Sequence, residues 1–341
     1  MSDFARTLVR WQRRHGRHDL PWQRTRDPYR IWLSEVMLQQ TQVETVRPYY
    51  ARFLSRFPDV NALARAPLGQ VLRLWSGLGY YARARNLHAA ARQIVRGHAG
   101  IFPRSVDELQ ELPGIGRSTA GAIAALAFGR RAAILDGNAK RVLARSFGVE
   151  GKSESWTLAE KLLPGRGIRS YTQGLMDLGA TICKRENPLC EQCPVEKRCV
   201  ARLTGRIDEL PPARRKKQIP VRNCAWLVLR HEGRVLLEKR PPIGLWGGLW
   251  TFPESHDGVP KPVDRLLGCE IGHVRQGADF EHVFTHFRMR VRPFYCEVRR
   301  VIPRAGEPGT RWFDIGMAAK AAVPSPVRTL LLEKMGTYPL F

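Results

Sequence analysis

The chain has 341 residues and carries 56 lysine and arginine residues against 31 aspartate and glutamate residues, a formal net charge of +25. This excess predicts a polyanionic partner and salt-dependent association, but it does not distinguish DNA from RNA or from an anionic membrane surface. The length is typical of two domains. The sequence lacks an apolar run of membrane-spanning length and the apolar segment of a signal peptide, so we expect a monomer in the cytoplasm or nucleoid, without membrane contact.

Residues 1 to about 202 show helical periodicity and no convincing strand pattern. A helix is predicted over residues 29–43, where Glu35 lies among apolar side chains. Its carboxyl group is either exposed to solvent or held in a dry pocket, where its pKa would rise and it could act as a general acid. The polar run over residues 39–42 could bind base edges or could end the helix. Residues 77–85, GLGYYARAR, suit a nucleic-acid contact and suit an ordinary loop equally well.

The stretch from Leu112 to Asp136 contains a glycine-rich turn between two predicted helices. Ser105 and Glu108 form a capping-box pattern that begins the first helix. Gly114 and Gly116 permit a tight hairpin, and an apolar run over residues 120–128 predicts the second helix. Unpaired amide groups at the start of that helix would form a phosphate site, although an ordinary turn between packed helices explains the same pattern.

Asp136 and Asn138 precede a predicted helix over residues 139–147, which Gly148 closes. Both occupy positions typical of helix caps, where such residues usually serve structure alone. A carboxylate at the mouth of a cleft that binds phosphates could also stabilise a developing cation.

Four cysteines share the spacing C-x6-C-x2-C-x5-C and lie in a basic segment: Cys183, Cys190, Cys193 and Cys199. Nothing in the sequence indicates secretion, so a disulfide framework is not expected. Four thiolates suit either tetrahedral zinc or an iron–sulfur cluster, and ligand chemistry alone leaves both open. Either group would be structural and would hold Lys197 and Arg198 on a rigid loop.

The segment from Thr204 to Val221 is basic and contains three prolines. It is expected to be an extended linker that follows DNA phosphates, or simply a solvated spacer.

From Arg222 the hydrophobic period changes to two, which predicts strands. A hairpin is predicted from residues 223–229 and 234–238, turning near Gly233. Residues 282–298 alternate between an apolar face and a basic face, and Ser325 begins a last helix that ends before Gly336. Three cysteines outside the array are expected to be buried or free thiols: Cys224, Cys269 and Cys296.

The glycine hairpin, the following aspartate and the cysteine array together resemble the helix-hairpin-helix DNA glycosylases that carry a [4Fe–4S] cluster. This resemblance favours iron over zinc. The sequences LPW at residues 20–22, WLSEVMLQQTQV at residues 32–43 and MDLG at residues 176–179 resemble the MutY-type adenine glycosylases. Bifunctional relatives carry a hairpin lysine that forms a Schiff base, and Ser118, which takes its place here, cannot form one.

The resemblance implies a mostly α glycosylase domain with the cluster over residues 1–203, a linker over 204–221 and an α+β Nudix-like domain over 222–341. The sequence WGGLWTFP at residues 246–253 resembles the start of a Nudix domain, but the REx2EE helix that would hold catalytic magnesium does not follow Glu254. The second domain should therefore recognise rather than hydrolyse. Phe284, Thr285 and His286 would form the loop that checks for 8-oxoguanine.

In that family, adenine opposite 8-oxoguanine or guanine in duplex DNA is flipped out and its glycosidic bond is hydrolysed. By position, Glu35 would protonate adenine N7, Asp136 would stay ionised and stabilise the oxocarbenium-like sugar or attack it, and Asn138 would support Asp136. The other residues implied to contact the substrate are Trp22, Leu38, Val43 and Asp177 in the adenine pocket, Gln40 and Tyr80 beside the oxidised guanine, and Ser118. The residues expected to bind DNA phosphates are Gly114, Gly116, Arg117, Lys197 and Arg198.

Three alternatives stay open from the residues alone. A glycosylase with lyase activity would need another lysine, with Lys140 the nearest. An iron–sulfur redox sensor that binds DNA would not need Glu35. A nucleotide hydrolase would need the carboxylates that the second domain lacks.

Overall fold

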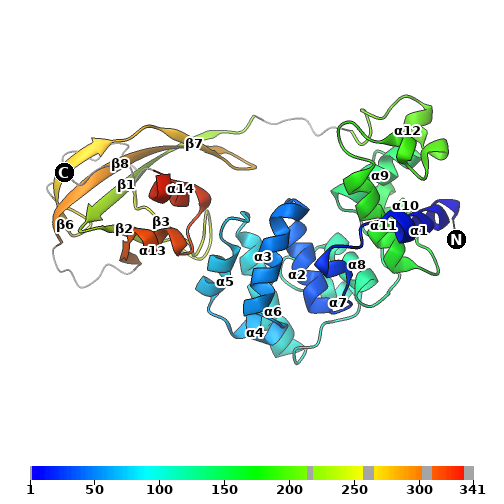
Figure 1. Ribbon diagram of the computed structural model, residues 1–341, viewed down its shortest axis with the longest axis horizontal. Coiled ribbons are helices and arrows are strands. Elements are labelled where there is room, and N and C mark those ends of the chain that lie inside the picture. The colour runs from blue at the N-terminus through cyan, green and yellow to red at the C-terminus, as the bar shows by residue number, and fades with distance from the viewer. Residues whose placement is uncertain (1, 213–217, 256–264, 302–308, 334–341) are drawn as a thin grey trace. The chain divides into compact units, whose positions relative to one another are not determined.

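The computed structural model describes residues 2–212, 218–255, 265–301 and 309–333 (Figure 1). Cα proximity divides the chain into two units: residues 1–65 with 86–215, and residues 66–85 with 216–341. In the part of the chain that the structure describes, no helix combines the length and the apolar character needed to cross a membrane.

Unit 1 is helical, as its periodicity predicts. Its elements are α1 (Asp3–His15), η1 (Pro21–Gln23), α2 (Pro28–Leu38), α3 (Val43–Arg56), α4 (Val60–Arg65), most of α6 (Ala82–Gly97), α7 (Val106–Gln110), α8 (Arg117–Leu126), α9 (Gly137–Phe147), α10 (Lys152–Lys161), α11 (Ile168–Thr181), η2 (Cys190–Gln192), η3 (Glu196–Arg198) and α12 (Val200–Leu203). The predicted capping box at the start of α7 is confirmed, with both of its reciprocal hydrogen bonds present. α9 ends at the predicted Gly148, which takes the left-handed conformation.

The core of unit 1 forms where α1, α8, α9 and α11 meet. α1 places its buried side chains at the spacing of one helix face and packs on α11, while α11 also contacts α8 and α9 (Figure 1). Leu8, Val142, Tyr171 and Leu175 are central members of this cluster. The approach of α8 is closest at Gly121, where an added Cβ would lie 2.1 Å from the carbonyl oxygen of Ala133. Glycine at this position therefore lets the backbone before Asp136 lie directly against α8.

Two predicted helix boundaries are wrong. The helix expected over residues 29–43 is two helices, because α2 ends at Leu38 and Gln40 takes a left-handed conformation, with φ of 58°, before α3 begins at Val43. The helix expected from residue 120 begins at Arg117, with Gly116 as its N-cap. The glycine hairpin thus runs directly into the first turn of α8.

Over the residues of unit 2 that the structure describes, nine strands form one sheet with the main order β3-β2-β1-β8-β6-β5. The strands are β1 (Val221–His231), β2 (Arg234–Lys239), β3 (Trp250–Thr251), β4 (Glu254–Ser255), β5 (Arg265–Leu266), β6 (Cys269–Gln276), β7 (Phe280–Val283), β8 (Arg288–Val301) and β9 (Thr310–Asp314). The predicted β1–β2 hairpin is confirmed, with Glu232 and Gly233 both at positive φ in its turn. β1 and β8 pair in parallel, and the other pairs are antiparallel.

The strand expected over residues 282–298 is instead a hairpin of β7 and β8, joined by residues 284–287. Its alternation is confirmed in β8, where Met289 and Val291 are buried and the three arginines between and beside them are exposed. α13 (Ile315–Lys320) contacts β2 and β9, and α14 (Ser325–Glu333) begins at the predicted serine and packs on α13 (Figure 1). α5 (Leu68–Trp75) also belongs to this unit.

Buried Arg145 on α9 forms hydrogen bonds with two loops near the end of unit 1, at residues 184–185 and 207–210. Its guanidinium donates to the carbonyl oxygens of Lys184 at 2.6 Å and Arg185 at 3.0 Å, and to those of Ile207 at 3.0 Å and Leu210 at 2.9 Å. Residues 206–210 are therefore folded onto the helical unit, whereas the sequence predicted an extended linker from Thr204. The basic run Arg214–Lys217 of that linker lies outside the described residues.

Replacing Arg145 with methionine should lower the free energy of unfolding of the protein by about 3 kcal/mol, because four backbone carbonyl oxygens lose their charged donor together. Urea denaturation of the full chain measures this change. The control is Arg206→Met in the same segment, which removes two exposed ion pairs and should cost much less, because exposed pairs are screened by solvent. Equal effects of the two variants would contradict the role assigned to Arg145.

Candidate active site and nucleic-acid interface

Glu35 lies on α2 in the wall of a cavity of about 460 Å³. Ile31, Ser34 and Trp22 line the same cavity. Burial and, to a smaller extent, the negative charge of Asp136 together raise the pKa of Glu35 to about 8. The carboxyl group is thus protonated at neutral pH and lies close enough to Asp136 to sense its charge.

Asp136 is the N-cap of α9. Its carboxylate accepts hydrogen bonds from the backbone amides of Ala139 at 2.9 Å and Asn138 at 3.4 Å. Burial raises the pKa of Asp136, while these amides and the positive charge of Arg141 oppose the rise. The start of α9 thus stabilises the anion of Asp136, whereas both causes that shift the pKa of Glu35 favour its protonated form.

Asn138 connects this helix start to α11. Its side-chain oxygen accepts a hydrogen bond from Arg141 at 2.9 Å, and Arg141 also donates to the carbonyl oxygens of Gly179 at 2.6 Å and Cys183 at 2.7 Å. A Cβ at Gly179 would lie 2.5 Å from that of Asn138, so only glycine permits this approach. Asn138 therefore supports Asp136 through its backbone amide, and its side chain holds Arg141, which bonds α9 to α11.

Some of the residues that line the cavity differ from those expected to line an adenine pocket. Asp177 does not line the cavity: it is completely buried and accepts hydrogen bonds from the side chains of Arg17 at 2.7 Å and Gln173 at 3.0 Å. Arg17 and Gln173 line the cavity instead. Burial raises the pKa of Asp177, and the charge of Arg17 opposes that rise. Leu38 and Val43 are also absent from the described lining, which includes Trp22.

Sequence reasoning missed the cations around this cavity. Besides Arg17, its lining includes Arg13, Arg24, Arg26 and Arg169. Arginines flank Trp22 in the sequence and could have indicated a basic site there, but only folding brings them beside α11. Their charges suit a ligand with phosphate groups at the cavity mouth.

The glycine hairpin presents the start of α8. Gly114 has φ of 78°, and the N-cap Gly116 has no side chain to bond the first amides of α8. Arg117 forms an ion pair with Glu160 and lies over the ring of Trp156 at 4.0 Å. Ser118 accepts a hydrogen bond from the amide of Leu135 at 3.0 Å, which fixes the segment that leads into Asp136.

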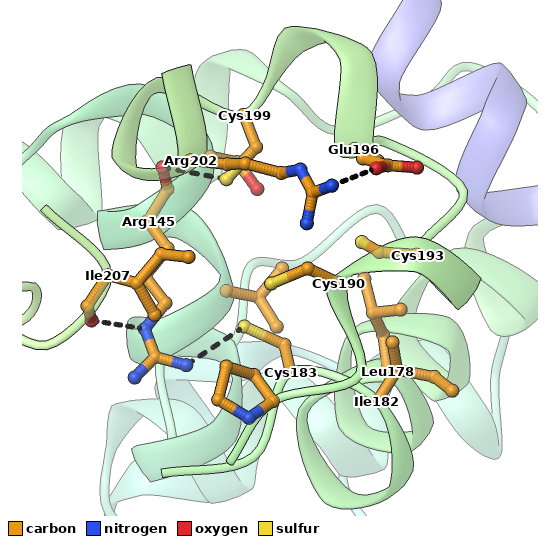
Figure 2. Close-up of a pocket in the computed structure, with 13 residues that line it drawn as sticks. Arg145, Leu178, Ile182, Cys183, Cys190, Cys193, Glu196, Cys199, Arg202 and Ile207 are labelled. Atoms are coloured by element: carbon orange, nitrogen blue, oxygen red, sulfur yellow. Dashed lines mark hydrogen bonds and ion pairs between the residues drawn. The ribbon is translucent and has the colours of Figure 1, made fainter. Parts of the chain in front are cut away.

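The four array cysteines line one pocket, together with Arg145 (Figure 2). Arg145 donates to the sulfur of Cys183 at 3.7 Å, and burial raises the pKa of Cys193 to about 12. Among the described residues, no three metal-binding side chains are grouped closely enough to register as an ion site. The expected metal-binding role therefore rests on the shared pocket and the four thiols. Lys197 and Arg198 are exposed nearby, and Arg198 pairs with Asp3.

Gln40 in unit 1 and Tyr80 in unit 2 share an unusual backbone. Both are exposed and both have positive φ, 58° for Gln40 and 47° for Tyr80. Non-glycine residues adopt this conformation rarely, and it is concentrated at functional sites. The amino-acid pattern alone gave no sign of it.

The loop between β7 and β8 is held by aromatic contacts. Phe284 stacks on Phe287 with ring centroids 4.5 Å apart and contacts His282 at 4.6 Å and Trp246 at 5.5 Å. Thr285 and the following His286 are exposed at its tip. The structure thus holds a rigid aromatic base with two polar side chains open to a ligand.

Comparisons with known proteins agree with both units. Residues 33–164 match the model of the HhH-GPD superfamily of base excision DNA repair proteins, and residues 224–333 match the NUDIX domain. A solved thermostable thymine-DNA glycosylase is similar over 59% of this chain and 95% of its own, with a TM-score of 0.55 and 33% identity. A non-covalent endonuclease III–DNA complex shares the fold, with a TM-score of 0.52 and 22% identity over 59% of this chain and 94% of its own.

Two curated relatives extend the likeness to both units. An adenine DNA glycosylase of Buchnera aphidicola subsp. Baizongia pistaciae is 34% identical over 98% of each chain. The adenine DNA glycosylase of Homo sapiens is 33% identical over 99% of this chain and 75% of its own. With this similarity over both units, and with a carboxylate-bearing cavity in the matched helical domain, the chain belongs to the adenine DNA glycosylase family of base excision repair enzymes.

Proposed function

We propose that this enzyme hydrolyses the glycosidic bond of adenine mispaired with 8-oxoguanine or guanine in duplex DNA, without efficient strand cleavage. The observation that carries the proposal is the pair of Glu35 and Asp136. Burial and the charge of Asp136 raise the pKa of Glu35 to about 8, whereas backbone amides and Arg141 oppose the rise that burial causes at Asp136. Two such carboxyl groups are what cleavage of a nucleoside through an oxocarbenium-like transition state needs.

Glu35 serves as the general acid. A flipped adenine in the cavity accepts the proton of Glu35 at N7, and the C1′–N9 bond breaks with its electron pair moving to the base. The base leaves as neutral adenine rather than as an anion. The raised pKa supports this step because the acid must hold its proton until the base is bound.

Asp136 stabilises the cationic sugar that remains. Its carboxylate is fixed by two backbone amides at the start of α9, so little reorganisation is needed as charge develops. A water molecule then adds to C1′ and loses a proton, which completes hydrolysis to an abasic site. Asp136 could equally form a transient bond to C1′ before water replaces it.

Arg17 and Gln173 present hydrogen-bonding groups to the adenine, while Asp177 holds both of them from behind. Trp22 provides an aromatic wall. Gln40 and Tyr80 enter the base stack, each from an exposed left-handed turn. The amides at Gly114 and Gly116, with Arg117, Lys197 and Arg198, bind phosphates.

The four array cysteines hold a [4Fe–4S] cluster. Their free thiols around one pocket fit a group bound by four thiolates. These four thiolates would bind the cluster and so would fasten the segment between Cys183 and Cys199. The chain's own contribution is the anchoring of that segment by Arg141 and Arg145.

Absence of strand cleavage follows from Ser118. Its hydroxyl accepts a backbone hydrogen bond and cannot form an imine with the sugar.

The loop of Phe284, Thr285 and His286 reads the opposite base. The sequence that follows Glu254, where catalytic carboxylates of a Nudix hydrolase would be sought, lies outside the described residues over 256–264.

Replacing Glu35 with glutamine should slow single-turnover adenine release by about 100-fold or more, because glutamine cannot donate the proton. DNA binding, measured by fluorescence anisotropy, should be retained. The matched control is Glu44→Gln at an exposed position of α3, which should leave the rate unchanged.

The rate of the unchanged enzyme should fall as pH rises through about 8, where Glu35 loses its proton. It should also fall in acid, as Asp136 gains one. Full activity of Glu35→Gln would overturn the assignment.

Replacing Thr285 with valine should reduce the preference for 8-oxoguanine over guanine opposite adenine by about tenfold, the value of one hydrogen bond near 1.4 kcal/mol. The shape of the side chain is preserved and its exposure leaves folding unaffected. Single-turnover rates on the two duplexes, with strand scission scored before and after alkali, give the ratio. Thr329→Val on α14 is the control for an exposed threonine of the same unit. An unchanged ratio would show that the Thr285 hydroxyl reads nothing, and scission before alkali would contradict the absence of lyase activity.

A further inference from the structure

The loop that carries Tyr80 is bonded to the C-terminal part of unit 2 through Ser76. The Ser76 hydroxyl is buried, donates to the carbonyl oxygen of Val323 at 2.7 Å and accepts from the guanidinium of Arg328 at 2.7 Å. Arg328 lies on α14 and also donates to the carbonyl oxygen of Ala319 at 3.1 Å. A serine at the end of α5 is thus held by a cation and an acceptor that lie some 250 positions later in the chain.

Tyr81 closes the same network from the other end of the loop. Its hydroxyl donates to the carbonyl oxygen of Val323 at 3.3 Å and accepts from the amide of Gly77 at 3.4 Å. Tyr80 lies between these anchors, with 49% of its surface exposed and φ of 47°. A left-handed conformation is strained for a non-glycine residue and persists only when its surroundings hold it. The contacts of Ser76 and Tyr81 provide that restraint.

A second contact connects this loop to the aromatic base of the β7–β8 loop. Arg85 donates to the carbonyl oxygen of Gly247 at 3.1 Å. The neighbouring Trp246 has φ of 54°, and its ring lies 5.5 Å from that of Phe284. Arg85, on the first turn of α6 directly after the loop of Tyr80, is thus bonded to the residue beside Trp246, whose ring contacts Phe284.

We propose that Arg328 is a positioning residue, which acts through Ser76 to hold residues 76–81 in the conformation that presents Tyr80 to the base stack. Insertion of Tyr80 into the DNA therefore depends on the part of unit 2 that reads the opposite base. The proposal rests on the proposed function, since it assigns Tyr80 and Phe284 to the same opposing base. Arginine suits the role because its fork bonds Ser76 and Ala319 together.

The test uses the full chain in the Glu35→Gln background, with 2-aminopurine placed beside the base opposite adenine. The Tyr80-dependent signal is the fluorescence change on binding of the protein with Tyr80 minus that of the same protein carrying Tyr80→Ala. Arg328→Met should reduce this change at saturating protein by about fivefold, the range of coupling between contacting residues. Arg328→Lys should restore part of it. The control is Arg234→Met, at an exposed ion pair with Glu232 in the β1–β2 hairpin, which should leave it intact.

A double-mutant cycle separates positioning from a general loss of folding. In active protein, Arg328→Met should lower the preference for 8-oxoguanine over guanine, and it should have no further effect once Tyr80 is alanine. Equal effects with and without Tyr80, or an unchanged fluorescence signal in Arg328→Met, would overturn the proposal, as would the absence of any Tyr80-dependent signal. If the unchanged enzyme shows no preference for 8-oxoguanine, the proposed recognition function fails, while the fluorescence measurement still decides the role of Arg328.

Discussion

The proposed chemistry depends on one electrostatic arrangement, in which the carboxyl group of Glu35 has a raised pKa beside the carboxylate of Asp136, which accepts hydrogen bonds from two backbone amides. Glu35 is placed on an apolar helix, where burial and the charge of Asp136 both favour its protonated form. Asp136 lies at a helix start, where backbone amides favour its ionised form although burial opposes it. The same fold therefore produces an acid and an anion from two similar side chains.

The surrounding structure fixes the backbone around that pair. Gly121 lets the strand-like segment before Asp136 pack on α8, and Ser118 bonds the same segment at Leu135. Gly179 lets α11 approach Asn138 at the first turn of α9. These contacts hold the start of α9 from both sides, so the helix amides point at the Asp136 carboxylate before any ligand arrives. Preorganisation of this kind reduces the reorganisation needed as charge develops.

Local chemistry made much of the molecule predictable. The Ser105 capping box, the glycine that ends α9, the β1–β2 hairpin and the alternation of β8 each depend on residues only a few positions apart. The pairing of Arg17 with Asp177 was not predictable, because these residues are 160 positions apart and meet only when α1 packs on α11. The left-handed turn at Gln40 also escaped sequence reasoning, since glutamine has no preference for positive φ and the surrounding fold must impose it. Likewise, no local pattern indicated that the Tyr80 loop would be bonded to Arg328.

A direct titration of the Glu35 carboxyl group tests the central claim. With glutamate labelled by ¹³C at its carboxyl carbon, the resonance absent from Glu35→Gln identifies Glu35 in the free protein. We expect that carbon to report a protonated carboxyl group at pH 7, with a midpoint near pH 8. A midpoint close to the ordinary glutamate value of 4.5 would show that the group is solvated and ionised at neutral pH, and the proposed acid would be lost.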